Sequence, residues 1–269
     1  MQATNLRTHE QAEQHDTTAF YDAIAEYYPY FYKDWETKLE REGLSLRSIF
    51  RKKGVVRVLV TACGVGTQAI PLAKLGFEVV ATDPSKGMLD KAQEIAQERG
   101  VDENIEFAQA SFEELLDVVE GPFDAIVCKG NALPHLVTDE AIETALLIFH
   151  ELLRPGGTLV LGMRDFDPFM EHRPRFLPGF DHVDDDGNEF ISFEIWEYEE
   201  GPPMVATQNL YLVKGKAPNL ETVKHTAKFR PLSVDEAKVV LMELGFEDFG
   251  EYPDRWEQVV HVRKPLGSL

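Results

Sequence analysis

The sequence has few cysteines, few basic residues and no long apolar run. Only Cys63 and Cys128 occur among 269 residues, each near the end of an expected core strand, and this favours a reduced, cytoplasmic protein over one built on disulfides. The chain carries 27 Lys and Arg against 47 Asp and Glu, a formal charge of −20. Because nucleic-acid binding needs clustered Lys and Arg, this balance argues against a nucleic acid and favours a small-molecule substrate. No apolar stretch reaches the ~18 residues that span a membrane, so we expect a soluble protein without a membrane partner.

Metal-binding patterns are also missing. The sequence contains no Cys-x-x-Cys motif and no paired-histidine spacing. The acidic segment HVDDDGNEF fails the calcium-loop template, because His182 would take the first ligand position and Phe193 the twelfth. We therefore expect no metal site, and we interpret the acidic stretch 181–200 as a solvated face.

The most informative stretch runs from Val55 to Asp83 and predicts a buried strand, a glycine turn, a helix, a second strand and an acid. The turn at Gly64 and Gly66 comes where a Cβ would block a ligand, and the helix after it offers free N–H groups there. Asp83, at the tip of the second strand, can accept both hydroxyls of a ribose. This unit alone also fits the looser dinucleotide-binding fingerprint, so two nucleotide classes stay open at this point.

The same stretch, LVTACGVGTQAIPLAKLGFEVVATD, resembles the first two motifs of class I S-adenosyl-L-methionine (SAM) methyltransferases. The resemblance implies SAM as cofactor, with Met88 packed on the adenine, Ser111 in polar contact with its amino group and Phe112 stacked on it. The donor-binding residues that it implies are Ala62, Gly64, Gly66, Asp83, Pro84, Met88, Ser111, Phe112 and Lys129. Two positions depart from the family pattern: Ala62 replaces the commoner first glycine, and Val60 stands where an acid is usual.

A second group of motifs narrows the resemblance. KGNALPHL at 129–136, Arg-Pro-Gly-Gly before the fifth expected strand and MRDFD after it are similar to glycine N-methyltransferase and the glycine or sarcosine methyltransferases. This similarity implies a small amino acid as acceptor, with Asn131 bonded to its carboxylate or amine. His135 would accept the amine proton or orient the loop. Arg164 would clamp the carboxylate. An Arg after an apolar strand is costly without an anion, and a salt bridge to a nearby acid is the alternative partner.

The N-terminal segment FYDAIAEYYPYFYKDW places aromatic residues at near-helical spacing, broken by Pro29. It predicts either a helix packed on the sheet or a lid over the methyl donor. We favour the lid, with Tyr21 and Tyr28 as the contacts, because so many tyrosine hydroxyls need partners.

The predicted fold is α/β, a doubly wound, mostly parallel seven-stranded sheet with an inserted antiparallel flap and an N-terminal helical lid. Three runs at about 189–199, 203–214 and 220–229 predict a three-stranded flap, after an irregular crossing from Phe166 to Pro178. A final helix and a hairpin would close the sheet, and this antiparallel edge is characteristic of SAM methyltransferases rather than nicotinamide domains. The expected divisions are an arm and lid (1–53), the SAM-binding core (54–165), the acceptor-binding flap (166–230) and the final helix with the closing hairpin (231–269).

We therefore predict a SAM-dependent methyltransferase acting on the amine of a small amino acid of glycine or sarcosine type. Two alternatives remain at this level. One is a methyltransferase for another small acceptor with an oxygen, sulfur or different nitrogen nucleophile. The other is a non-catalytic SAM-binding regulatory protein, which would have no need of an acceptor pocket at Asn131, His135 and Arg164.

Overall fold

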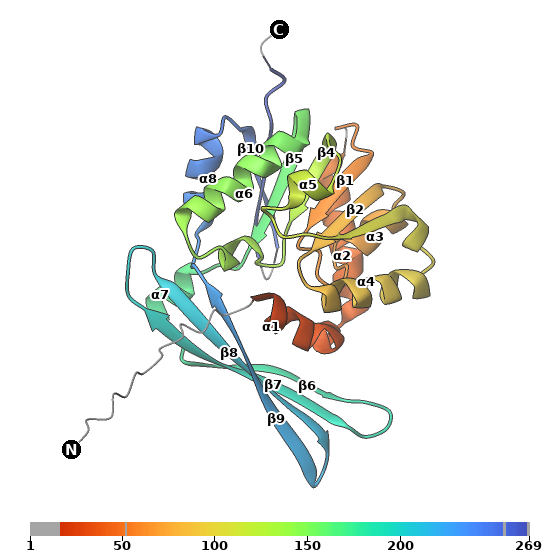
Figure 1. Cartoon of the computed structure of the whole chain (residues 1–269), viewed down its shortest axis with the longest axis vertical. Helices are drawn as coiled ribbons and strands as arrows, with labels where there is room; N and C mark the ends of the chain where they lie inside the picture. The colour runs from red at the N-terminus through yellow and green to blue at the C-terminus, as the bar shows by residue number, and fades with distance from the viewer. Residues whose placement is uncertain (1–16, 52, 255–256, 268–269) are drawn as a thin grey trace, which may run out of the picture.

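The computed structural model describes residues 17–51, 53–254 and 257–267, which form an α/β core and a separate antiparallel sheet (Figure 1). The expected N-terminal arm falls mostly on residues 1–16, outside the described residues. None of the helices in these ranges is both long and apolar enough to cross a membrane.

The core sheet has seven strands: β1 (Arg57–Thr61), β2 (Glu78–Asp83), β3 (Ile105–Gln109), β4 (Phe123–Cys128), β5 (Leu153–Met163), β10 (Glu247–Pro253) and β11 (Gln258–Arg263). Their order is β3-β2-β1-β4-β5-β11-β10. The first five strands run parallel, and β11 pairs antiparallel with β5. The predicted sheet and its antiparallel closing hairpin are confirmed. Because parallel strands end at one edge, the segments after β1, β2, β3 and β4 are available to one site.

Helices cover both faces of this sheet, and alternate strand residues pack against each layer. One layer contains α2 (Trp35–Phe50), α3 (Ala69–Lys74) and α4 (Lys86–Glu98). The other contains α5 (Leu115–Val118), α6 (Asp139–Leu152) and α8 (Val234–Glu243). On β1, Val58 and Val60 face the first layer and Leu59 faces the second, so the strand is buried on both sides as its unbroken apolar run predicts. Short 3₁₀ turns η2 (Asp102–Asn104) and η3 (Leu133–His135) complete the connections.

Helix starts follow ordinary capping chemistry. The side chains of Asp34 and Ser85 accept the N–H groups of Thr37 and Met88 at the starts of α2 and α4. Ser233 begins α8 with a capping box, as its position before a helical pattern predicts.

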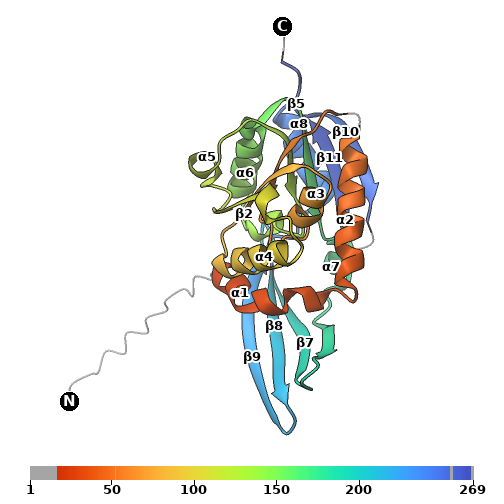
Figure 2. The same ribbon diagram turned by 90° about the vertical axis from the view of Figure 1, so that its right-hand side faces the viewer.

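The aromatic N-terminal segment forms α1 (Thr17–Ile24) followed by the 3₁₀ helix η1 (Ala25–Phe31), which contains Pro29. The proline lacks an N–H, so the regular helix does not continue through it. Figures 1 and 2 both show α1 between the core and the antiparallel sheet, and Figure 2 shows α2 running along the side of the core.

The antiparallel sheet follows α7 (Asp167–His172) and has four strands, not the three that the sequence predicts. They are β6 (Phe176–Val183), β7 (Glu189–Glu199), β8 (Val205–Lys216) and β9 (Asn219–Phe229), in that order across the sheet. The expected irregular crossing from Phe166 to Pro178 is therefore wrong both at Asp167–His172, which forms α7, and from Phe176 onward. Pro178 and Gly179 are unfavourable in a strand, so the sequence does not predict β6. The strand forms because β6 is at the edge of the sheet and has a register shift between Pro178 and Asp181, where proline is tolerated. Gly179 is needed there because a Cβ would lie 2.0 Å from Ser192 Oγ.

Candidate functional site

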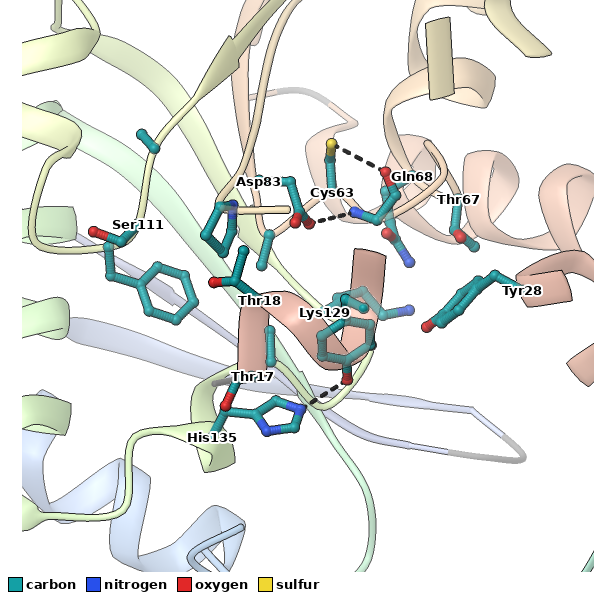
Figure 3. A pocket seen from close by; sticks show the side chains of 18 of the residues that line it. Thr17, Thr18, Tyr28, Cys63, Thr67, Gln68, Asp83, Ser111, Lys129 and His135 are labelled. Carbon is teal, nitrogen blue, oxygen red and sulfur yellow. Dashed lines mark hydrogen bonds between the residues drawn. The ribbon is translucent and has the colours of Figure 1, made fainter. Parts of the chain in front are cut away.

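A cavity of about 310 Å³ opens at the carboxyl ends of the parallel strands, beneath α1 and η1 (Figure 3). Its volume is at the lower end of the range for small-molecule sites. Ten of the fourteen residues expected at the site line it: Tyr21, Tyr28, Ala62, Gly64, Asp83, Pro84, Ser111, Phe112, Lys129 and His135. The turn after β1, the tip of β2 and the segments after β3 and β4 thus meet where the fold predicts a ligand.

The glycine turn is tied to the tip of β2 through Asp83. One carboxylate oxygen of Asp83 accepts the N–H of Gly64 at 2.8 Å, and the other accepts the N–H of Ser85 at 2.9 Å. Gly64 has φ +55° and nothing within 4 Å of where a Cβ would lie, so the turn leaves open space at the cavity. Ala62 also has a positive φ, +47°, which explains why glycine is the commoner residue there.

The Asp83 carboxylate is 6% exposed. Burial raises its pKa to about 6, the N–H groups of Ser85 and Gly64 act in the opposite direction, and the charge of Asp22 adds to the increase. Each Asp83 oxygen keeps a lone pair beyond its backbone hydrogen bond, so the group can still accept hydroxyl donors.

Ser111 lies at one end of the cavity (Figure 3), and the next residue, Phe112, also lines it. The backbone N–H and hydroxyl of Ser111 both donate to a Glu114 carboxylate oxygen at 2.8 Å. The hydroxyl oxygen therefore has its lone pairs available, and it can accept from an amino group. The Phe112 ring is half-buried, and it lines the cavity while forming a T-shaped pair with Phe149 at 5.5 Å between centroids.

The lid brings Tyr21 into contact with His135 of η3. The Tyr21 hydroxyl lies 2.7 Å from His135 Nε2, and Nδ1 lies 3.0 Å from the carbonyl oxygen of Lys228 on β9. A carbonyl only accepts, so Nδ1 carries the proton and Nε2 accepts from Tyr21. Burial lowers the pKa of His135 to about 4, although the bond to Lys228 opposes the shift, and the ring is neutral at pH 7. The Tyr21 oxygen therefore has its lone pairs free at the cavity.

The opposite end of the cavity contains buried charges that the sequence analysis missed, apart from Lys129. The Lys129 ammonium donates to Glu42 of α2 at 2.7 Å and lies 3.3 Å from Glu257, which precedes β11. Lys38 donates to the other Glu42 oxygen at 2.7 Å and also lines the cavity. Burial lowers the pKa of Lys129, but the charges of Glu257 and Glu42 outweigh burial and raise it. Glu42 and Glu257 lie 87 and 128 positions from Lys129 in the sequence, so no local motif could have grouped these three residues.

Four expected site residues do not line the cavity: Gly66, Met88, Asn131 and Arg164. Gly66 instead gives room to Ile70, whose Cδ1 would lie 2.6 Å from an added Cβ, and Met88 is 1% exposed in the core. Asn131 has φ +64°, and its side-chain oxygen accepts the backbone N–H of Arg164 at 3.0 Å.

Arg164 follows β5 and faces the rings of Phe169 and Trp196, with its guanidinium carbon 5.2 and 5.6 Å from their centroids. It makes no ion pair within the part of the chain that the structure describes. Burial raises the pKa of Tyr21 well above its usual value, and the charge of Arg164 opposes the shift, which places the two side chains in one electrostatic environment.

Comparisons with known proteins agree with this geometry. A family model described as a methyltransferase domain matches residues 58–157. The chain is 33% identical over 235 residues to the glycine/sarcosine N-methyltransferase of Parasynechococcus marenigrum (strain WH8102), covering 85% of this chain and 78% of that enzyme. The enzyme of the same name from Halorhodospira halochloris is 33% identical over 139 residues, and this match spans about half of each chain, 52% and 51%.

Among solved structures, the CcbJ methyltransferase from Streptomyces caelestis superposes with a TM-score of 0.72 at 20% identity, over 93% of this chain and 99% of that one, which shows a shared fold. With the match along most of the P. marenigrum enzyme, the chain belongs to the class I SAM-dependent methyltransferases, in the family of the glycine/sarcosine N-methyltransferases.

Proposed function

We propose that the chain transfers a methyl group from SAM to the amine of a small amino acid of glycine or sarcosine type. The residues that line the cavity support donor binding. Asp83 offers two carboxylate oxygens for a ribose, and the Ser111 hydroxyl and the Phe112 face suit the amino group and ring of an adenine. The open space at Gly64 admits the ligand to the backbone. When bound, SAM supplies an already activated methyl group on a positively charged sulfur.

Arg164 is the observation that supports a carboxylate-bearing acceptor. Arg164 is part-buried, and its guanidinium lies beside two aromatic rings with no carboxylate partner among the described residues. The alternative weighed from sequence, a salt bridge to Asp165, Asp167 or an acid of the flap, is not formed there. A part-buried cation favours an anion, and the guanidinium fork matches a carboxylate with two parallel hydrogen bonds. The bond from Asn131 to the Arg164 backbone makes Asn131 a positioning residue for this group.

Positioning supplies most of the rate gain in such a displacement, since the acceptor amine needs only to be neutral, oriented and shielded from water. Neutral His135 holds the Tyr21 hydroxyl at 2.7 Å, and this arrangement turns the free lone pairs of Tyr21 toward the cavity. We assign His135 an orienting role, because its Nε2 is occupied and its lowered pKa makes it a weak base.

The test is turnover of labelled SAM with glycine, sarcosine, dimethylglycine and matched amines that lack a carboxylate. Arg164→Lys and Arg164→Ala should each lose about 10²-fold or more in kcat/KM for the amino-acid acceptor, the equivalent of ~3 kcal/mol of lost positioning. SAM affinity should stay near that of the unaltered protein. Exposed Arg175 on the approach to β6 provides the matched control, and Arg175→Ala should retain turnover.

Two outcomes would remove the amino-acid proposal and leave only the methyltransferase assignment. One is equal or better turnover of the amines without a carboxylate. The other is full turnover of the amino acid by Arg164→Ala.

A further inference from the structure

Glu257 has one carboxylate oxygen that is buried without a hydrogen bond. Its side chain is 9% exposed, and Oε1 accepts the N–H of Gly130 at 2.8 Å. Oε2 lies 3.3 Å from the Lys129 ammonium, but no described group donates a hydrogen bond to it. A buried carboxylate oxygen without a donor is costly, and Glu257 also lines the cavity. The structure therefore points to a donor that comes from a ligand.

The other buried carboxylates near this end of the cavity have their partners. Glu42 accepts from Lys38 and Lys129, one on each oxygen, at 2.7 Å. Asp83 accepts two backbone N–H groups. Burial raises the pKa of Glu257, whereas the two lysines outweigh burial and lower that of Glu42. Among these three acids, Glu257 is the one with a carboxylate oxygen that accepts no hydrogen bond from a described group.

Gly162 on β5 leaves the space that this carboxylate occupies. A Cβ on Gly162 would come within 2.6 Å of Glu257 Oε2 and 2.8 Å of Lys129 Cε. Any larger residue at Gly162 would push Glu257 and Lys129 away from the strand. The absence of a side chain at Gly162 therefore leaves room for the Glu257 carboxylate beside β5.

The covalent order of SAM decides which of its groups reaches Glu257. Adenine, ribose, sulfur and the amino-acid tail follow one another along the molecule. With the adenine at Ser111 and the ribose at Asp83, the tail extends toward the opposite end, where Figure 3 shows Lys129 and Tyr28. That tail carries an ammonium, and β1 offers no acid to it because Val60 is apolar and buried.

We propose that Glu257 Oε2 accepts the α-ammonium group of the donor's amino-acid tail, so that the residue directly before β11 contributes to donor binding. This inference rests on the donor site proposed above. It assigns to the closing hairpin a binding role in addition to its place at the sheet edge.

The experiment is a thermodynamic cycle measured by calorimetry. It uses S-adenosylhomocysteine and its analogue with hydrogen in place of the α-amino group. The unaltered protein should bind the analogue at least tenfold more weakly, because a charge-assisted hydrogen bond is lost. Glu257→Gln keeps the acceptor for Gly130 and removes the charge. It should bind S-adenosylhomocysteine at least tenfold more weakly and bind the two ligands within about threefold of each other.

The control is Glu251→Gln on the same hairpin, whose carboxylate pairs with Lys238 at the surface, and it should match the unaltered protein with both ligands. If Glu257→Gln does not fold, Glu257→Asp takes its place in the cycle, since it retains the charge but withdraws it from the ligand.

The inference is overturned if the unaltered protein binds both ligands equally. It is also overturned if the Glu257 variant weakens both to the same degree, which is the sign of a purely structural role. Failure of the unaltered protein to bind S-adenosylhomocysteine at all would instead reject the donor site itself.

Discussion

Protonation of Asp83 should weaken adenosine binding, and the structure gives the size and direction of the effect. Burial raises the Asp83 pKa to about 6, against the N–H groups of Gly64 and Ser85, with Asp22 adding to the increase. A ribose favours the ionised form, which accepts both hydroxyls, so proton binding competes with ligand binding and affinity falls as the pH falls through about 6. With this pKa, about ten elevenths of Asp83 is ionised at pH 7 and about one eleventh at pH 5. The expected loss is therefore roughly tenfold, or ~1.4 kcal/mol.

The assay is calorimetric titration between pH 5 and pH 7.5 with 5′-methylthioadenosine, which keeps the ribose and lacks the amino-acid tail. Burial also raises the pKa of Glu257. Because this ligand has no amino-acid tail, Glu257 makes no proposed contact with it and should not contribute to the pH dependence. His135, with a pKa of about 4, is neutral throughout this range. Asp83→Asn should bind more weakly at pH 7 and lose the pH dependence. Constant affinity of the unaltered, folded protein across this range would refute the proposed contact between Asp83 and the ribose.

Three further substitutions test the cavity. Phe112→Ala should weaken SAM binding by roughly 0.5–1.5 kcal/mol beyond the effect of the lost buried area. A large fall in melting temperature with normal SAM affinity would show instead that the ring only packs on Phe149. Tyr21→Phe leaves Nε2 of buried His135 without its hydrogen-bond donor. The substitution should lower the free energy of unfolding by ~1–3 kcal/mol and also reduce turnover. A chemical denaturation curve that matched the unaltered protein would contradict this hydrogen bond. Gly162→Ala should displace the ion pairs beside β5 and weaken the binding of SAM more than the binding of 5′-methylthioadenosine. Calorimetry that gave equal losses of affinity for the two ligands would show a general distortion of the cavity instead.

Most of the expected residues that line the cavity are carried by strand ends. Apolar runs without alternation predict buried parallel strands, and a parallel sheet brings the ends of those strands to one edge. Asp83, Ser111 and Lys129 therefore reach one cavity although each was identified from its own short motif. Their proposed roles in donor binding stay predictions.

The charged end of the cavity could not be predicted in this way, because its partners come from different layers of the fold. Glu42 is one residue of an amphipathic helix, and Glu257 is one acid among several in the closing hairpin. Nothing in their neighbourhoods distinguishes them from solvated residues. Only the packing of α2 and the hairpin around Lys129 brings them together, at sequence separations of 87 residues for Glu42 and 128 for Glu257. The edge strand β6 was missed for a related reason, since proline and glycine are tolerated there by its position in the sheet.

The N-terminal aromatic segment shows why two interpretations of one pattern need not exclude each other. Tyr21, Tyr28 and Tyr32 line the cavity, as expected of a lid. Other rings of the same segment pack on the antiparallel sheet, with Tyr30 stacked on His182 at 4.0 Å and Phe31 edge-on to Phe180 at 4.8 Å, as expected of packing. A short helix followed by a 3₁₀ turn directs its aromatic side chains to both sides, so one segment can close the cavity and also join it to the flap. The segment that carries the cavity tyrosines is thus held by the antiparallel sheet, so under the proposed function a change in that sheet should alter SAM affinity as well as turnover.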